Sequence, residues 1–466
     1  MKKLSIIALF IAAIGLIGPK IIGSGANQNI NLAVAAINEA PGYQATVVSV
    51  ESGWFSTSAK VNVGLDPAIF GDISSNPEVA AFFEDFSITF YVNAQHGPFL
   101  SLNGLGVGLL ALKAEVDESM LRDKLTYSDD QRLFSLAMDV GLFGSVGYAD
   151  KVEGFTVIGM DDISFSGWTG KGSMSSSHLD YKGQMGSLAM DLGVAGFEIN
   201  SMSLVMDVDD SWASMMTDPF YDSTFEFNIG SLIMGSSTDQ SGTVTIDNMV
   251  MDGVSKQSDD GQLLDVDFNY SVGRITTPQF TAEDLVVKTE LLNLEKGFIT
   301  AMQEVSANPL ALEEMASEFE SKLLPQLQVS PAFNITEMSG TVGDGSFSGK
   351  MLTKVAGVEG IPANLEDLGF WASKVVVDSK FEVEKAMALF VAEVSLNSQF
   401  KNNPAISAQM TDTEIEALAG QQAATMVDTL SQQGMVAVNA EGNLEIIFTM
   451  KDGQAVLNGN PMPLPF

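Results

Sequence analysis

Ile199-Asn-Ser-Met-Ser-Leu204 is one of five similar stretches that decide the expected fold of this chain. In each, an apolar residue precedes two small or polar residues, and a second apolar residue follows them. The other four are Met160-Asp-Asp-Ile-Ser-Phe165, Ile229-Gly-Ser-Leu-Ile-Met234, Ile246-Asp-Asn-Met-Val-Met251 and Ile335-Thr-Glu-Met-Ser-Gly340. Alternating apolar and polar residues are typical of a β-strand, and two polar residues in a row predict a bulge or an edge step. The copies are irregularly spaced, which favours a row of similar strands in one long, curved sheet over a strict solenoid. Convergent patterning is the alternative to true repetition.

The strand-like pattern extends well beyond these stretches. Short alternating segments from about Ser87 to Gly273 are separated by clusters of Gly, Ser, Asn and Asp. Further upstream, alternation on both sides of Gly53 predicts a hairpin. The first half of the chain is therefore expected to be rich in antiparallel β-structure.

Composition changes near Thr281. Leucines at positions 285, 291 and 292 give the segment from Thr281 to Leu327 a helical character. Further on, Thr411-Asp-Thr-Glu414 forms a capping box that predicts a helix to about Gln433. The Asp-Gly pair at 452–453 predicts the turn of a closing hairpin.

The N-terminus predicts export. Lys2 and Lys3 precede an uncharged apolar run, the charge asymmetry of a signal peptide or signal anchor. If the segment is retained, Leu4 to Ile22 rises about 28 Å as a helix, close to the thickness of a bilayer core. We expect a periplasmic protein anchored in the inner membrane, with a soluble periplasmic form cleaved near Ala26 as the alternative.

Together these features predict an α+β protein in three parts. An N-terminal signal anchor helix or signal peptide covers residues 1–26, and a long, twisted antiparallel β-rich body covers 27–280. An α+β C-terminal region covers 281–466, with helical segments and a closing β-hairpin.

Composition excludes several functions. The chain has 59 acidic and 23 basic residues, a formal net charge of −36, which argues against nucleic acid as a partner. It has no cysteine, which excludes disulfides, thiol catalysis and thiolate metal sites.

No catalytic motif is present, so we expect no enzymatic activity, no cofactor and no metal. His96 and His178 are the only histidines. His96 precedes a Gly-Pro turn, where a structural role is favoured over that of a general base. His178 lies in a polar loop, and the acidic doublets along the chain are best explained as solvated turns.

An ordered set of short motifs resembles the YdgA-like family of Gram-negative envelope proteins. They are the lysine-led N-terminus, the Gly53-Trp-Phe-Ser56 turn, His96-Gly-Pro-Phe99, and the closing segment from Lys451 to Gly459. The residues that we single out as a structural motif are Gly53, Trp54, Phe55, His96, Gly97, Pro98, Asp452, Gly453, Asn458 and Gly459. The resemblance implies a periplasmic protein tethered to the inner membrane with no assigned reaction, and it carries over no catalytic residue. This chain is unusually acidic and poor in arginine for that family.

Methionine gives the strongest hint of a function. The chain has 24 methionines, many of them on alternating segments, where they fill a core or form an adaptable apolar groove. The groove candidates are Met160, Met202, Met234, Met249 and Met251. The leading hypothesis is a non-enzymatic protein that binds a lipid or another hydrophobic ligand along a curved β-sheet. The alternatives are a periplasmic scaffold that acts as a homodimer, and a hydrolase that uses His96 with nearby carboxylates.

Overall fold

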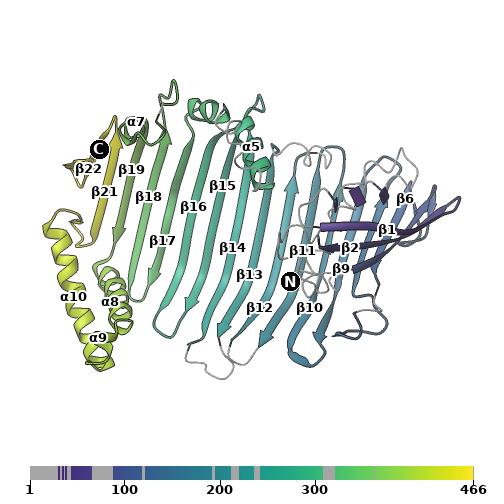
Figure 1. The fold of residues 1–466 in the computed structure, drawn as a ribbon, viewed down its shortest axis with the longest axis horizontal. Helices are drawn as coiled ribbons and strands as arrows, with labels where there is room; N and C mark the ends of the chain where they lie inside the picture. The colour runs from purple at the N-terminus through teal and green to yellow at the C-terminus, as the bar shows by residue number, and fades with distance from the viewer. Residues whose placement is uncertain are drawn as a thin grey trace. The chain divides into compact units, whose positions relative to one another are not determined.

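The computed structural model describes residues 30–31, 34–35, 37–38, 43–65, 88–117, 121–191, 195–210, 220–235, 242–307, 321–362 and 364–464. The expected signal anchor and the cleavage site near Ala26 lie outside these residues. Within them, no helix combines the length and apolarity needed to cross a membrane. The described chain is mostly antiparallel β-structure, with a few helices toward the C-terminus (Figure 1).

The chain forms two compact units, one made of Met1–Thr238 with Gln303–Leu312 and the other of Asp239–Met302 with Glu313–Phe466. Residue 281, where composition changes, is the first residue of a strand in the second unit.

The first unit is an antiparallel meander in which each strand pairs with the next long strand of the chain. Its order is β1-β2-β3-β6-β8-β9-β10-β11-β12-β13, with β7 beside β9 and a small β4–β5 ribbon apart. The bounds are β1 (Tyr43–Ser52), β2 (Ser56–Leu65), β3 (Ile88–His96), β4 (Phe99–Leu100), β5 (Gly106–Val107), β6 (Leu110–Val116), β7 (Leu125–Thr126), β8 (Phe134–Val140), β9 (Val146–Val157), β10 (Met160–Met174), β11 (Leu179–Asp191), β12 (Gly196–Val208) and β13 (Ser223–Gly235).

The sheet of the first unit curls over and buries its own apolar face. In Figure 1, β1 and β2 lie across β9, β10 and β11. Val63 and Phe90 from the N-terminal strands belong to the same buried cluster as Phe134 and Met185. Phe90 and Phe134 meet edge to face, with ring centroids 6.1 Å apart. Both rings are completely buried, and burying each stabilises the fold by about 1.5–3 kcal/mol. The interior of this unit is therefore filled.

The second unit is also an antiparallel meander. Its order is β14-β15-β16-β17-β18-β19-β21-β22-β23, with β20 also paired to β21. The strand bounds are β14 (Val244–Gln257), β15 (Leu263–Thr276), β16 (Thr281–Glu295), β17 (Ala332–Val342), β18 (Gly345–Val355), β19 (Val375–Val383), β20 (Ala437–Val438), β21 (Leu444–Lys451), β22 (Gln454–Leu457) and β23 (Asn460–Met462). The helices with described bounds are α5 (Lys296–Ala307), α7 (Leu368–Lys374), α8 (Lys385–Lys401), α9 (Pro404–Ser407) and α10 (Asp412–Gln432), and residues 321–328 are helical as well.

The capping box confirms the start of α10. The Thr411 side chain accepts a hydrogen bond from the Glu414 backbone N–H, and the Glu414 carboxylate accepts one from the Thr411 N–H. Ile415, Ala419 and Ala423 are buried at four-residue spacing, on the side of α10 that packs against α8. The predicted helix to about Gln433 is thus confirmed.

The predicted helical character from Thr281 is wrong for the first fifteen residues, because Thr281–Glu295 is strand β16. Leu291 pairs with Val266 on one neighbouring strand and with Phe333 on the other. Two ladders of backbone hydrogen bonds and the Val286-Val287 pair favour the extended conformation here. The helix begins only at Lys296.

The predicted bulges are confirmed in two of the five stretches. Two other stretches contain a residue with a left-handed backbone instead. Register shifts occur between Met160 and Ser164 and between Ile335 and Met338. Ser201 and Asn248 instead have left-handed backbone conformations, each with φ of 54°, without a shift in register at that point. In the stretch 229–234, Gly230 lies opposite Ser201, between the pairs Asn200–Ser231 and Met202–Ile229. The double-polar pattern therefore marks two kinds of strand irregularity.

Candidate functional site

One face of the second unit's sheet is apolar from β14 to β21. Directly paired residues of antiparallel strands project from the same face, so the strand register assigns the side chains. Met251 pairs with Tyr270, Tyr270 with Val287, and Val287 with Met338. The residues that the register places on this side, called the apolar face below, are Met249, Met251, Val266, Phe268, Tyr270, Val272, Leu285, Val287, Leu291, Phe333, Ile335, Met338, Met351, Phe381 and Phe448.

The opposite face of the same strands is polar. Lys288 and Glu337 form an ion pair of 2.7 Å across β16 and β17. The Asn334 side-chain amide donates to Glu290 at 3.1 Å, between the same two strands. This regular division into an apolar and a polar side is the pattern of a sheet that normally packs on one side only.

The apolar face is not buried as the first unit's core is. None of its residues is fully buried, and the side chains of Tyr270 and Phe333 are each 42% exposed. By contrast, Phe90 and Phe134 in the first unit are completely buried. The fourteen residues of β14 span about 46 Å, at about 3.3 Å per residue. Exposed apolar surface of this extent is typical of surfaces that bind hydrophobic ligands or partners.

The five groove methionines do not all lie together. Met249 and Met251 belong to the apolar face of the second unit, beside Val272 and Tyr270. Met202 packs against the core of the first unit, and Met234 of the same unit is 39% exposed. Met160 begins β10, and its side chain lies outside the described residues.

The N-terminal members of the structural motif lie together at one end of the first unit. Gly53 begins the β1–β2 turn, where its N–H donates to Ser56 O at 2.7 Å, and Trp54 and Phe55 project from that turn. The His96 N–H donates to Phe55 O at 2.8 Å. Gly97, with φ of 115°, and Pro98 continue from His96 into the next loop.

His96 has a structural environment. Its Nε2 atom lies 3.1 Å from the hydroxyl of Thr57, which is buried. This contact fixes the imidazole against β2, on the strand that follows the exposed turn.

The C-terminal members of the motif form two tight turns. Asp452 and Gly453 join β21 to β22, and Asn458 and Gly459 join β22 to β23, all with positive φ. This backbone suits two-residue hairpin turns. The Asn458 amide also donates to Gly434 O and Met435 O, each at 3.1 Å, which fastens the hairpin to the segment after α10.

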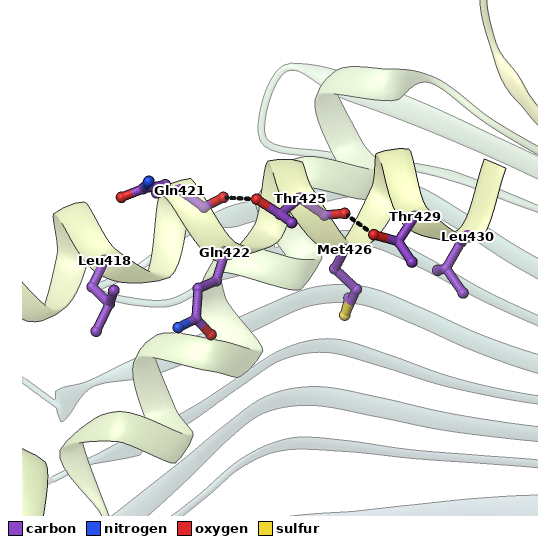
Figure 2. A pocket seen from close by; sticks show the side chains of 7 residues that line it. All are labelled: Leu418, Gln421, Gln422, Thr425, Met426, Thr429 and Leu430. Carbon is purple, nitrogen blue, oxygen red and sulfur yellow. Dashed lines mark hydrogen bonds between the residues drawn. The ribbon is translucent and has the colours of Figure 1, made fainter. Parts of the chain in front are cut away.

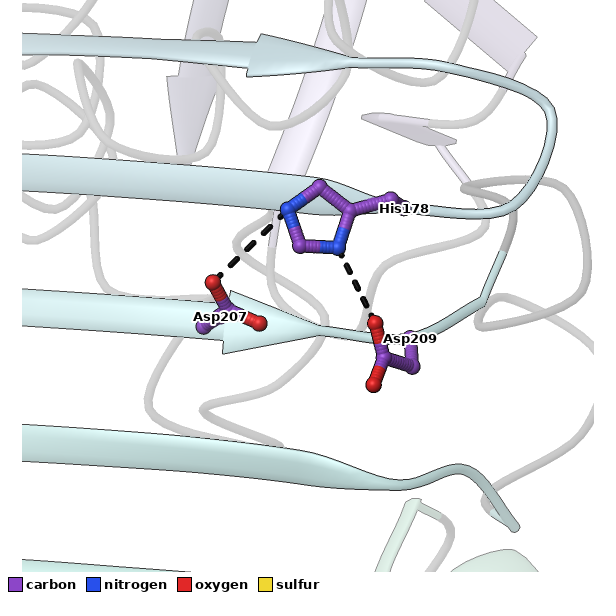
Figure 3. A group of neighbouring side chains, drawn as sticks. All are labelled: His178, Asp207 and Asp209. Carbon is purple, nitrogen blue, oxygen red and sulfur yellow. Dashed lines mark hydrogen bonds and ion pairs between the residues drawn. The ribbon is translucent and has the colours of Figure 1, made fainter.

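His178 forms a cluster with Asp207 and Asp209 at the end of β11 and β12 (Figure 3). Its Nδ1 lies 3.1 Å from Asp209 and its Nε2 lies 3.7 Å from Asp207. The hydrogen bond to Asp209, the Asp207 carboxylate and other nearby acids raise the pKa of the imidazole above its usual 6.5. Three candidate metal ligands meet here, but all three side chains are substantially solvated. The geometry fits equally well a protonated His178 that pairs with the two carboxylates.

Sequence reasoning missed a buried acid in the first unit. Asp150 on β9 is only 4% exposed, and the Tyr181 hydroxyl donates to its two oxygens at 3.1 and 3.3 Å. The Trp168 indole N–H in turn donates to the Tyr181 hydroxyl at 3.0 Å. Burial raises the pKa of the Asp150 carboxyl, and the hydrogen bond from Tyr181 partly opposes this rise. No motif in the sequence distinguishes Asp150 from the many other acids.

Glycines let these large side chains lie flat on the sheet. A Cβ atom at Gly183 would lie 2.8 Å from Trp168 Cε2, and one at Gly172 would lie 2.6 Å from Tyr148 Cζ. The rings of Tyr148 and Tyr181 stack with centroids 6.0 Å apart. The cluster is thus closely packed and has the character of a polar core, not of an open site.

A shallow hollow of about 520 Å³ lies along α10. Figure 2 shows its lining, which comes from this one helix: Leu418, Gln421, Gln422, Thr425, Met426, Thr429 and Leu430. Met426 is 43% exposed. Leu418, Met426 and Leu430 form an apolar stripe interrupted by Gln422, on a different side of the helix from the residues buried against α8.

Comparison with known proteins gives one family. A family model described as a bacterial protein of unknown function (DUF945) matches residues 1–465. No curated protein and no solved structure matches the chain.

Proposed function

We propose a function for this chain, which belongs to the DUF945 family of bacterial proteins of unknown function. It is a non-enzymatic protein of the cell envelope that binds a lipid or another hydrophobic ligand. The proposed binding surface is the apolar face of the second unit. The observation that carries the proposal is the incomplete burial of that face along strands β14 to β21.

The physical argument is one of area. Removing apolar surface from water is worth about 25 cal/mol per Å², so a face with rings as exposed as Tyr270 and Phe333 gains free energy when acyl chains cover it. Met249 and Met251 add side chains that adapt to varied apolar shapes. The polar groups that would select a polar or charged substrate lie on the other side of the sheet, at Lys288 and Glu337 for example.

The proposed location is the periplasm, with the N-terminal segment as an inner-membrane anchor. The support is the order of Lys2, Lys3 and the apolar run from Leu4 to Gly18. Alkaline phosphatase fused to the C-terminus is active only outside the cytoplasm, so an inactive fusion would contradict this location.

The binding proposal is tested by a matched pair of substitutions. Phe333 on β17 is 42% exposed on the apolar face, and Leu352 on β18 is 41% exposed on the opposite face. The protein is purified as the full chain, and its bound lipid is quantified by mass spectrometry. Phe333→Lys should lower the bound lipid several-fold, because a lysine charge is costly to bury against acyl chains. Leu352→Lys should leave it near the wild-type level.

Two results would contradict the proposal. One is a wild-type protein that carries no more lipid than a protein of similar size purified in the same detergent. The other is an equal effect of Phe333→Lys and Leu352→Lys, which would place the lipid elsewhere.

A second candidate function is a scaffold that acts as a homodimer. It is favoured by the exposed apolar stripe beside the hollow on α10, where Met426 projects from the helix (Figure 2). A hydrolase that uses His96 has less support, because the ring contacts the Thr57 hydroxyl at 3.1 Å and that hydroxyl is buried.

A further inference from the structure

Three loops of the first unit end in fully solvated apolar side chains. Trp54 in the β1–β2 turn is 95% exposed, Leu105 in the β4–β5 loop is 97% exposed, and Phe143 in the β8–β9 turn is 100% exposed. The complete set of exposed apolar side chains in these loops, called the apolar tips below, is Trp54, Phe55, Phe99, Leu105, Val107, Leu142 and Phe143. Because these side chains are solvated, they add no free energy of burial to the stability of the unit.

Strand register places all three loops at the same end of the sheet. Ser56 pairs with Gln95 at the start of β2, and His96 pairs with Leu110 at the start of β6. Leu110 pairs with Val140, the last residue of β8. The loops that follow or precede these residues therefore project in the same direction.

Backbone hydrogen bonds connect the loops to one another. The His96 N–H donates to Phe55 O at 2.8 Å, and the Gly97 N–H donates to Leu109 O at 3.2 Å. The Leu109 N–H donates to Val140 O at 2.8 Å. The apolar tips are consequently carried on one connected platform at the sheet's end.

The loops that carry the apolar tips are uncharged. Residues 52–59, 94–112 and 140–149 contain no Asp, Glu, Lys or Arg, in a chain with 59 acidic residues. Farther along the same end, Asp207 and Asp209 flank His178 beside β11 and β12. Carboxylates border the platform more closely at Glu51, next to the β1–β2 turn, and at Asp139, which accepts a hydrogen bond from the Asn103 side chain at 3.1 Å.

We propose that the apolar tips insert into the surface of a bilayer rich in zwitterionic phospholipid. A fluid bilayer can surround side chains that protrude separately from different loops. Trp and Phe also favour the interface between headgroups and acyl chains. The three uncharged loops meet no repulsion at the headgroups, whereas the neighbouring carboxylates oppose an anionic surface. This inference does not depend on the ligand proposed for the second unit.

The test uses a probe at the tips, because the N-terminal apolar run could hold the full chain on a membrane by itself. The chain has no cysteine, so Val107→Cys provides a unique site for an environment-sensitive fluorophore. Asp130→Cys, in the exposed loop before β8, provides the matched control at the opposite end of the same strands. Each labelled full chain is mixed with vesicles of zwitterionic phosphatidylcholine, with or without brominated acyl chains.

We expect the label at position 107 to shift to the blue and to be quenched by brominated acyl chains, and the label at position 130 to remain unchanged. Replacing part of the lipid with anionic phosphatidylglycerol should weaken the shift. A triple variant should lower the fraction of protein whose tips are inserted by about tenfold or more; it combines Trp54→Ser, Leu105→Ser and Phe143→Ser. Each substitution loses most of the transfer free energy of a large apolar side chain. The control triple Leu365→Ser, Leu368→Ser and Met435→Ser removes exposed apolar side chains of the second unit and should have no effect.

Three results would overturn the inference. The first is a label at position 107 that brominated lipid quenches no more than the label at position 130. The second is a blue shift without vesicles that grows with protein concentration, which would make a second copy of the chain the occupant. The third is an unchanged shift in the triple variant of the tips.

Discussion

Ser201 on β12 faces Gly230 on β13, and the backbone of Ser201 is left-handed at that point. A Cβ atom at Gly230 would lie 3.0 Å from Asn200 O and would also collide with the Ser201 hydroxyl. The second unit repeats the relationship, since Asn248 on β14 is left-handed and a Cβ at Gly273 on β15 would lie 3.1 Å from Asn248 Cβ. At both places the left-handed residue on one strand lies opposite a glycine on the next.

Gly230→Ala should lower the free energy of unfolding by about 1–3 kcal/mol, because neither the Asn200 carbonyl nor the paired strands can move freely. Equilibrium unfolding in urea measures the change. Gly147→Ala on β9 is the matched control, since a Cβ there meets no atom within 4 Å. The double variant Ser201→Gly, Gly230→Ala should regain part of the loss. Equal stabilities of the two single alanine variants would contradict this explanation.

Asp150→Asn should alter how the stability of the first unit depends on pH. Because burial raises the folded-state pKa of Asp150, the folded state holds this proton at pH values where the unfolded state has lost it. The contribution of Asp150 is therefore most favourable below the ordinary pKa of 3.8, and it declines as the pH rises toward the folded-state pKa. Asparagine stays neutral and still accepts from Tyr181.

The stability of Asp150→Asn relative to wild type should consequently increase between pH 4 and pH 7, as measured by urea unfolding at each pH. Asp130→Asn, at an exposed acid, controls for the loss of one negative charge. A stability difference that is constant over this range would show that Asp150 titrates alike in both states.

Asp209→Asn should lower the pKa of His178 toward 6.5, because the hydrogen bond to Asp209 is the largest cause of its raised value. Titration of the imidazole C–H signals by NMR measures the pKa, with His178→Asn identifying the resonances. Asp207→Asn should have a smaller effect, since Asp207 acts only through its charge at a longer distance. The reverse order would mean that Asp207 is the main partner of the ring.

Met426→Glu tests the homodimer. If the stripe on α10 is a dimer face, a carboxylate buried at position 426 should dissociate the dimer, and light scattering should report the monomer mass. Met435→Glu is the control, because Met435 is 48% exposed just beyond the end of α10. A wild-type protein that is monomeric at every concentration would remove this alternative.

Local signals predicted the parts of the fold that local interactions determine. The Thr411–Glu414 capping box predicts the start of α10, and the Asp-Gly pair at 452–453 predicts the β21–β22 hairpin. The leucines from Thr281 failed as a helix signal because their spacing also suits a strand, and the choice depends on partners such as Phe333, far away in the chain.

The candidate site could be predicted only in part for the same reason. Met249 and Met251 were recognised by their alternation, whereas Tyr270 and Phe333 join them only through strand register. Asp150 could not be found at all, since its burial depends on Tyr181 and Trp168 from two other strands.

The strand sequence of each meander has a consequence for how the molecule is assembled. From β9 to β13, and again from β15 to β19, every strand bonds to the one synthesised immediately before it. Most closures are therefore short, and their entropic cost is small. During synthesis, the sheet of each unit can therefore grow one hairpin at a time, before the C-terminal end of the chain has emerged.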